Sequence, residues 1–280
     1  MSIVDMRVLV LGSSGTCGRS VCSAFQEAGH NVIPWDISLS TSHDLRVAGC
    51  LDEILPTIDF VVFLAFDVGG AKYMTESSTM YIDNNLLIMY NTFASIKKVG
   101  CPFIHTTSTM SNMNHIPYAV LKRLGEFYTE MLGGINMRLW NVYGREPICI
   151  KSHVIPDLID QAVSANTITL RTDGCEERSF LHADDFARGV VAVAENYTDL
   201  RGRGTIDISS SEWTSIIKVA ETIQSIAYNT MNKNVTIIPS NTKDSTHTHR
   251  NEPDLTLISK YWSPRLSLYD GISLCFDLHM

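Results

Sequence analysis

The stretch GSSGTCG places Gly12, Gly15 and Gly18 three residues apart, directly after the apolar run RVLVL. Glycines so placed permit a tight turn, close approach of the backbone to a bound pyrophosphate, and close packing of a helix on a strand. A helix-forming segment and a second short apolar run, NVIPW, follow the turn. We predict a strand, glycine turn, helix and strand over residues 7–35, which is the opening of a dinucleotide-binding fold.

The same alternation continues through the first half of the chain. The further apolar runs and the helical segments between them are 60–66, 85–99, 101–107, 118–132 and 135–144. Strands that are buried on both faces of a parallel sheet read as continuous apolar runs. We therefore predict an α/β fold with a doubly wound, mostly parallel sheet of the Rossmann type over residues 1–145.

The pattern changes after about residue 145, where short strand-like and helix-like segments alternate. We predict that residues 146–280 form mainly a smaller substrate-binding region, and that part of 175–210 completes the sheet. Such a region would cover the cleft outside the carboxyl ends of the strands, where open α/β sheets bind ligands. We predict that the polar stretch 229–252 contains a long surface loop.

Composition excludes several classes of protein. Hydrophobic residues make up 45% and charged residues 19% of the chain, which is typical of a folded globular protein. A formal net charge of −8 argues against nucleic-acid binding, because phosphate contacts need a basic face. The first apolar run has no basic segment before it, and no later one approaches the roughly 20 residues that span a bilayer. We predict a cytoplasmic protein that binds neither membranes nor nucleic acid.

The seven cysteines are scattered, odd in number and free of any C-x-x-C pair. Neither a disulfide framework nor a zinc site fits that spacing. We predict reduced thiols that pack as small hydrophobic side chains, and no metal. Their positions are 17, 22, 50, 101, 149, 175 and 275.

Asp36 follows the second predicted strand, eighteen residues after Gly18. An acidic side chain there accepts hydrogen bonds from the hydroxyls of an adenosine ribose and repels a 2′-phosphate, so we predict NAD as the cofactor. Asp44 is a candidate for the adenine amino group, with an isolated surface aspartate as the alternative. The predicted cofactor-binding residues are Gly12, Gly15, Thr16, Cys17, Gly18, Asp36, Asp44, Leu45, Leu64, Ala65, Tyr118 and Lys122.

Tyr118 and Lys122 stand four residues apart in PYAVLKRLGE, where Pro117 suits the first turn of a helix. Residues at that spacing project from one helical face. An ammonium group beside a phenol lowers the pKa of the phenol, which can then accept a proton from a sugar hydroxyl. Ser108 follows a predicted strand at the carboxyl edge of the sheet and can hydrogen-bond the same hydroxyl.

With these motifs in order, the chain resembles the extended short-chain dehydrogenase/reductase family, in particular its nucleotide-sugar epimerases and dehydratases. The landmarks are GSSGTCG, FLAFDVGG, IDNNLLIMYN, PYAVLK, RLWNVYG, SHVIP, RSFLHADD and YWSPRLSLYDGI. The resemblance implies a tightly held nicotinamide and transient oxidation of a sugar ring. It implies Tyr118 as the base, Lys122 on the nicotinamide ribose, and Ser108 with Thr107 on the reacting oxygen.

Details of the resemblance limit which reactions of this family are expected. Sugar 4,6-dehydratases carry an acidic residue one or two places after the strand-end Ser or Thr, where this chain has Thr109 and Met110, so dehydration is not expected. The segment KSHVIPDLI resembles the one that supplies a histidine acid/base in GDP-fucose synthases. That likeness makes His153 a catalytic candidate beside a 4-keto group, with substrate contact or a structural role as the alternatives. His115 is a weaker candidate.

The resemblance also implies substrate-binding residues. Arg178 and Arg250 match positions whose guanidinium groups contact the nucleotide diphosphate, and either could instead be a solvated surface charge. Thr107 and Asn141 complete the predicted substrate group, while Asn85 matches a position that braces the active-site loop. Only nine residues separate Ser108 from Tyr118, fewer than is usual in the family, which predicts a more open cleft or a different substrate.

Three functions remain open from the sequence. The first is an NAD-dependent epimerase of a nucleotide diphosphate sugar that works through a transient 4-keto sugar. The second is an NAD(P)H-dependent reductase or epimerase-reductase of a 4-keto-6-deoxy nucleotide sugar, with His153 as acid/base. The third is a dinucleotide-binding protein without catalytic activity. By resemblance we also expect a homodimer through the helices near 85–99 and 118–132.

Overall fold

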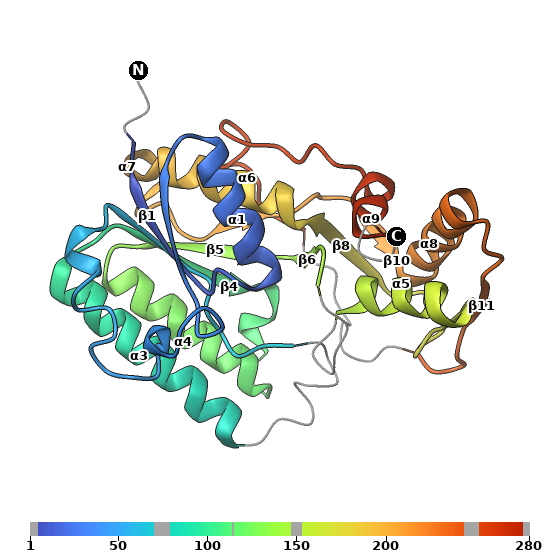
Figure 1. The fold of residues 1–280 in the computed structure, drawn as a ribbon, viewed down its shortest axis with the longest axis horizontal. Helices are drawn as coiled ribbons and strands as arrows, with labels where there is room; N and C mark the ends of the chain where they lie inside the picture. The colour runs from blue at the N-terminus through green and yellow to red at the C-terminus, as the bar shows by residue number, and fades with distance from the viewer. Residues whose placement is uncertain (1–4, 70–78, 114, 147–152, 244–251, 277–280) are drawn as a thin grey trace.

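The computed structural model describes residues 5–69, 79–113, 115–146, 153–243 and 252–276. Its centre is a six-stranded sheet with the order β2-β1-β3-β4-β5-β9, in which every neighbouring pair is parallel (Figure 1). The strands are β1 (Arg7–Leu11), β2 (Asn31–Trp35), β3 (Phe60–Phe63), β4 (Phe103–Ser108), β5 (Ile135–Leu139) and β9 (Ile206–Ile208). The predicted doubly wound parallel sheet is confirmed, and its strand order changes direction between β1 and β3, where such sheets bind ligands.

Helices cover both faces of this sheet, α1 and α6 on one side and α3 and α4 on the other (Figure 1). They are α1 (Thr16–Glu27), α3 (Thr79–Val99), α4 (Pro117–Met131) and α6 (Ala183–Glu195). Along β1, Val8 and Val10 belong to the core cluster that includes α1 and α6, whereas Leu9 and Leu11 belong to the cluster that includes α3 and α4. Side chains of a strand alternate between faces, so burial on both sides produces the continuous apolar run seen in the sequence.

A second set of elements lies beyond the carboxyl edge of the sheet (Figure 1). A three-stranded sheet has the order β10-β8-β6, and β7 pairs with β11. The strands are β6 (Asn141–Tyr143), β7 (Thr167–Thr169), β8 (Glu177–His182), β10 (Trp213–Ser215) and β11 (Thr236–Ile238). Helices α5 (Val154–Ala165), α8 (Ile216–Met231) and α9 (Leu268–Phe276) enclose a separate apolar core with these strands. The short helix α7 (Tyr197–Leu200) follows α6, and 3-10 turns η1 (Thr41–His43), η2 (Leu55–Thr57) and η3 (Thr109–Asn112) lie in loops.

Two predicted elements differ from the structure. The run 135–144 is divided, because β5 pairs with β4 and β9 while β6 pairs with β8 of the second sheet. The helix predicted over 85–99 begins at Thr79. Within the stretch 229–252, α8 runs to Met231 and β11 pairs with β7, while residues 244–251 lie outside the described residues, so the long loop predicted there stays a prediction. The strand β11 has only three residues, of which Ile237 is half-buried and Thr236 and Ile238 are exposed, so it gives little signal within a polar stretch.

Within the described residues, no helix is both long and apolar enough to cross a membrane. Over the same part of the chain, no group of three or more His, Cys, Asp or Glu side chains is placed to hold a metal ion. The six described cysteines are free thiols, and Cys149 lies outside the described residues.

Candidate active site

One cavity of about 1090 Å³ runs from the glycine turn across the carboxyl ends of the main strands to the second set of elements. Every described residue of the predicted catalytic, cofactor and substrate groups lines it. These are Gly12, Gly15, Thr16, Cys17, Gly18, Asp36, Asp44, Leu45, Leu64, Ala65, Thr107, Ser108, Tyr118, Lys122, Asn141, His153 and Arg178. Arg250 lies outside the described residues, and His115 is not among the lining residues.

The glycine turn brings two backbone segments into direct contact. Gly12 has φ +85°, and a Cβ there would lie 2.8 Å from backbone atoms of Ala65. A Cβ on Gly18 would lie 2.1 Å from the carbonyl oxygen of Gly12. Helix α1 starts at Thr16, and its N-cap residue, Gly15, has no side chain that could cap the first backbone N–H groups. The N–H groups of the first turn, whose residues line the cavity, therefore have no side-chain cap, which suits the pyrophosphate of a dinucleotide.

Asp36 and Asp44 both make local hydrogen bonds at this end of the cavity. The Asp36 carboxylate accepts from the backbone N–H of Ser14 at 3.1 Å and of Ser38 at 2.9 Å, which fixes it beside the glycine turn. Asp44 is not an isolated surface aspartate, because it pairs with Arg46 at 2.8 Å. That hydrogen-bonded guanidinium holds the pKa of Asp44 below its usual range.

The backbone after β3 is held by Asn85, the residue expected to brace this loop. Asn85 is fully buried in α3, and its amide oxygen accepts from the backbone N–H of Asp67 at 2.7 Å. Its amide nitrogen donates to the carbonyls of Asp67 and Tyr81, each at 3.0 Å. Both hydrogen bonds to Asp67 hold the segment that carries Leu64 and Ala65 against the glycine turn.

Ser108, Tyr118 and Lys122 meet where β4 ends and α4 begins. Ser108 is the last residue of β4, and its hydroxyl accepts from the backbone N–H of Met110 at 3.2 Å. Tyr118 is the second residue of α4, and Lys122 lies one turn further on. The Lys122 Nζ donates to the carbonyl of Thr106 at 3.0 Å and lies 4.0 Å from the centre of the Phe66 ring.

Burial has the largest influence on the pKa values of this pair, an influence that the sequence prediction for Tyr118 and Lys122 did not include. Burial raises the pKa of Tyr118, although a hydrogen bond with Ser108 opposes the rise. Burial also lowers the pKa of Lys122 to about 7, against weaker opposing effects of Cys17 and Glu126. Lys122 is therefore not a permanent cation, so its influence on the phenol depends on pH.

The lowered pKa of Lys122 predicts a pH-dependent stability. The pKa of about 7 in the folded protein lies below the value of 10.5 of an unperturbed lysine, so between these values the unfolded chain binds a proton that the folded protein lacks. The free energy of unfolding then rises with pH in that window. Relative to Lys122→Met, we expect the wild type to gain about 1.5 kcal/mol between about pH 7 and about pH 8.5. Urea unfolding of both proteins across this range measures it, and parallel profiles would contradict the assignment.

The hydroxyl of Thr107 is hydrogen-bonded within the protein, which does not fit its predicted contact with the reacting oxygen of the substrate. Its hydroxyl donates to the carboxylate of Glu126 at 2.6 Å, and both residues are buried. Arg123 donates to the other oxygen of Glu126 at 2.6 Å. Thr107 therefore ties β4 to α4, which leaves Ser108 as the strand-end hydroxyl beside Tyr118.

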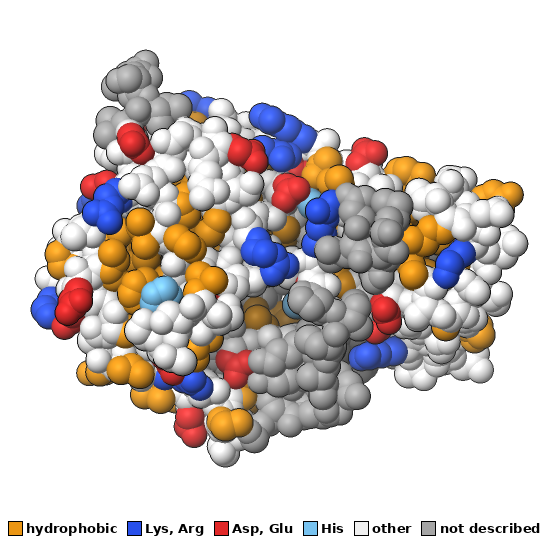
Figure 2. Space-filling view, viewed as in Figure 1, with side chains coloured by type: hydrophobic (Ala, Val, Ile, Leu, Met, Phe, Trp, Pro, Cys, Tyr) orange, Lys and Arg blue, Asp and Glu red, His pale blue; other side chains and the backbone are white. Residues whose placement is uncertain are grey.

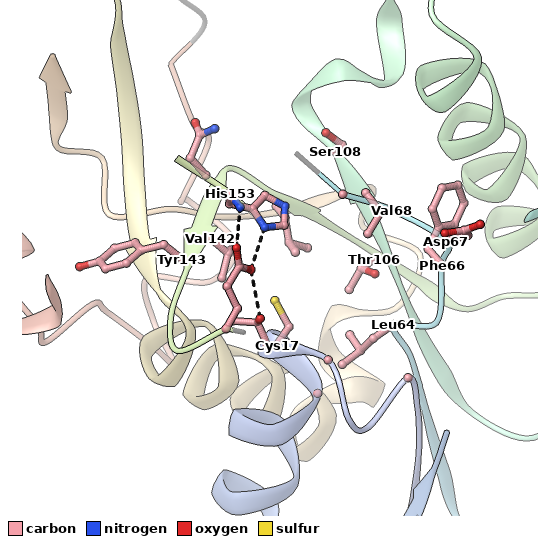
Figure 3. A pocket seen from close by; sticks show the side chains of 18 of the residues that line it. Cys17, Leu64, Phe66, Asp67, Val68, Thr106, Ser108, Val142, Tyr143 and His153 are labelled. Carbon is pink, nitrogen blue, oxygen red and sulfur yellow. Dashed lines mark hydrogen bonds and ion pairs between the residues drawn. The ribbon is translucent and has the colours of Figure 1, made fainter. Parts of the chain in front are cut away.

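His153 approaches the cavity at the start of α5 and is joined to a residue that the sequence prediction missed. Its ring Nδ1 lies 2.9 Å from the Glu146 carboxylate, which also accepts from the backbone N–H of His153 (Figure 3). Thr16, at the start of α1, donates to the same carboxylate at 3.3 Å. Burial raises the pKa of Glu146, yet hydrogen bonds from His153 and Thr16 outweigh this effect and lower it overall. The only sequence signal was an acidic residue shortly after the NVYG strand.

Two aromatic features of the cavity were also missed. Trp35 and His43 stack with ring centroids 3.9 Å apart, beside Asp36. Phe66 packs edge-on against Tyr118 at 5.7 Å. The sequence marks these side chains only as apolar or polar, because neither contact follows from a regular spacing along the chain.

Comparison with known proteins agrees with this geometry. A family model described as the NAD dependent epimerase/dehydratase family matches residues 8–209. The chain belongs to this family. NAD is accordingly its cofactor, and the glycine turn, the uncapped start of α1 and the placement of Asp36 fit that molecule.

The individual relatives have low sequence identity to this chain. UDP-glucuronic acid decarboxylase 1 of Arabidopsis thaliana is 21% identical, over 95% of this chain and 68% of that protein. GDP-L-fucose synthase 1 of the same plant is 22% identical, over 100% of this chain and 95% of that protein. The crystal structure of UDP-glucose 4-epimerase from Thermotoga maritima, with UDP-glucose, has a TM-score of 0.81 at 18% identity and covers 98% of each chain. The likeness to the epimerase structure shows that the two proteins share this fold.

Proposed function

We propose that this protein is an epimerase of a nucleotide diphosphate sugar that works through a transient 4-keto sugar, with Tyr118 as the proton acceptor. The observation that carries the proposal is that Ser108, Tyr118 and Lys122 lie in the wall of the cavity that begins at the glycine turn. Bound NAD supplies a hydride acceptor that can return the same hydride, so no second redox substrate is consumed.

Tyr118, Ser108 and Lys122 have different roles in the proposed proton transfer. The Tyr118 phenolate accepts the proton of the sugar hydroxyl during oxidation and, as the phenol, returns it during reduction, while Ser108 hydrogen-bonds the same oxygen. Because burial raises the pKa of Tyr118, loss of its proton requires a positive charge nearby. The Lys122 Nζ lies 5.9 Å from the Tyr118 ring centre, close enough for its ammonium form to favour the phenolate. Rotation of the keto sugar before the hydride returns then inverts the carbon.

The proposed substrate class rests on both the cavity and the relatives. Asn141 at the start of β6 and Arg178 on β8 line the cavity from the second set of elements. A guanidinium suits a diphosphate, and the chain as a whole is acidic, so local arginines are needed to bind one. Relatives named as acting on or making UDP- and GDP-linked sugars support a nucleotide sugar.

The test of this proposal begins with the nucleotides that the purified protein carries. Denaturation followed by chromatography with mass detection should release NAD(H) in nearly one-to-one ratio with the chain, as expected of an enzyme that recycles its hydride. A protein that retains no nucleotide and then binds NADPH in preference to NADH would contradict both the recycling and the role of Asp36.

One observation favours a second candidate, an epimerase-reductase of a 4-keto-6-deoxy nucleotide sugar. His153 lines the cavity with a carboxylate on its Nδ1, which is the arrangement of a histidine acid/base. A proton could then leave and return at a carbon beside the keto group. This candidate predicts net consumption of NAD(P)H when a 4-keto sugar is supplied, whereas the epimerase consumes none.

We also propose a homodimer formed through α3 and α4. On α4 a stripe of apolar side chains is exposed, and it ends at Met131, which is 86% exposed. The stripe and its neighbours on α3 comprise Met80, Leu86, Leu87, Tyr90, Val120, Leu124, Phe127, Tyr128 and Met131. Figure 2 shows hydrophobic side chains at the surface over this part of the molecule. A second copy that repeats the same stripe would cover it by two-fold symmetry.

The dimer predicts that Phe127→Asp produces a monomer. Phe127 is 50% exposed in the centre of the stripe, and two-fold symmetry would place the new carboxylate in the interface twice. Sedimentation at micromolar concentration should show a dimer for the wild type and a monomer for the variant. Tyr228→Asp, which changes an exposed aromatic residue of α8, should stay dimeric. A monomeric wild type would contradict the proposed homodimer.

A further inference from the structure

We propose that Glu146 is a positioning residue that holds His153 as a proton-transfer group with its Nε2 directed at the substrate, and that it anchors this pair to the start of α1 through Thr16. The proposal rests on the acid/base role of His153 in the second candidate function. It concerns a residue that shares no motif with the Ser108, Tyr118 and Lys122 group.

The hydrogen bonds of Glu146 leave His153 one free ring nitrogen. One carboxylate oxygen accepts from the backbone N–H of His153 at 2.5 Å, and the other lies 2.9 Å from Nδ1. A carboxylate accepts but does not donate, so Nδ1 carries a proton and the neutral imidazole keeps its lone pair on Nε2. Both residues line the cavity, and the Glu146 side chain is 11% exposed whereas that of His153 is 46% exposed, so the imidazole is the more accessible of the two groups.

Thr16 extends this arrangement to the glycine turn. Its hydroxyl donates at 3.3 Å to the oxygen that faces Nδ1. Thr16 is the first residue of α1, while Glu146 follows β6 and His153 precedes α5. The start of α1, the residue after β6 and the residue before α5 therefore share one carboxylate, which fixes the histidine relative to the cofactor-binding turn.

The other charged and titratable groups around this pair do not replace Glu146. From α1, the Cys17 thiol has its pKa raised to about 12 by burial, so it stays neutral, and Arg19 donates to the backbone carbonyls of Ser14 and Arg145. From α4, Lys122 donates to the carbonyl of Thr106. From α5, the Asp157 carboxylate accepts from Gln161 at 3.2 Å. Glu146 is thus the carboxylate that holds the imidazole.

Deuterium exchange at carbons beside a keto group tests the proposal without requiring hydride transfer. The holoenzyme is incubated in D2O with GDP-4-keto-6-deoxymannose or dTDP-4-keto-6-deoxyglucose, and deuterium at C3 and C5 is followed by mass spectrometry. We expect Glu146→Gln to slow the exchange about 10- to 100-fold at nearly unchanged KM, because a glutamine NH2 would donate to Nδ1 and favour the opposite tautomer. Asp160→Asn, which removes a carboxylate from α5 outside the cavity, should exchange like the wild type.

Two further results separate positioning from a structural role. In a His153→Ala background, Glu146→Gln should have no additional effect, since residues that act as a unit are not additive. NMR of protein with 15N-labelled histidines should show the His153 proton on Nδ1 in the wild type and a changed tautomer in Glu146→Gln. The His153 signals are assigned by their absence from His153→Ala. The proposal would be overturned if the wild type exchanged deuterium into neither keto sugar, or if Glu146→Gln exchanged at the wild-type rate. It would also be overturned if the tautomer of His153 were the same in Glu146→Gln as in the wild type. Loss of epimerisation in Tyr118→Phe with exchange retained would bear on the proposed function alone.

Discussion

Tyr118→Phe is expected to lower turnover by about 10²- to 10⁴-fold, the range that general acid–base catalysis contributes. The substitution removes one oxygen and keeps the ring, whose edge-on contact with Phe66 does not involve the hydroxyl. We therefore expect thermal unfolding of the variant to match the wild type closely and NAD to remain bound. Turnover measured on the nucleotide sugar that the wild type converts provides the comparison.

Tyr128→Phe is the matched control on the same helix. Tyr128 is 37% exposed and stacks on Phe93 with ring centroids 5.0 Å apart, away from the cavity. Its loss of a hydroxyl should leave turnover unchanged. If Tyr118→Phe retained wild-type turnover, Tyr118 would not be the proton acceptor. If the wild type had no turnover on any nucleotide sugar, the noncatalytic dinucleotide-binding function would be favoured.

Gly18→Ala is expected to have the largest effect on the fold. A Cβ at Gly18 would lie 2.1 Å from the Gly12 carbonyl oxygen and 2.7 Å from the Cα of Ser13, and both are backbone atoms that cannot rotate away. Alanine is about 1 kcal/mol better than glycine inside a helix, so a net loss of stability would show that the clash dominates. We expect a loss of about 2 kcal/mol or more in the free energy of unfolding, with NAD binding strongly weakened.

Gly15→Ala is the comparison within the same turn. Gly15 has φ −67°, and a Cβ there would meet only the Gly12 carbonyl, at an ordinary 3.5 Å. Urea unfolding without added nucleotide should therefore place Gly15→Ala close to the wild type and Gly18→Ala well below it. Equal stabilities for the two variants would show that the close approach at Gly18 does not constrain the turn.

The sheet was predictable because its signals are local. Each buried strand is an apolar run, and the glycines after β1 have few other roles at that spacing directly before a helix. The placement of Tyr118 and Lys122 on one helical face also follows from local periodicity. The ends of parallel strands meet at one edge, which brings Ser108 to the same place.

Features that depend on contacts between distant segments were not predictable. Glu146 and His153 are seven residues apart with no regular spacing, and their hydrogen bond arises because β6 and α5 meet beside α1. The predicted role of Thr107 ignored the buried Glu126 on α4. The protonation of Tyr118 and Lys122 depends on burial, which a sequence pattern does not quantify.

The central claim is that a hydride leaves C4 of a nucleotide sugar and returns to the same carbon. Its most direct test supplies UDP-, GDP- and dTDP-hexoses that carry deuterium at C4 to the NAD-bound protein and analyses the products by NMR. We predict conversion of one of them to its C4 epimer, with the deuterium retained at C4 and no net accumulation of NADH. Products that have lost the deuterium to solvent, or steady consumption of reduced nucleotide without epimer, would contradict the account.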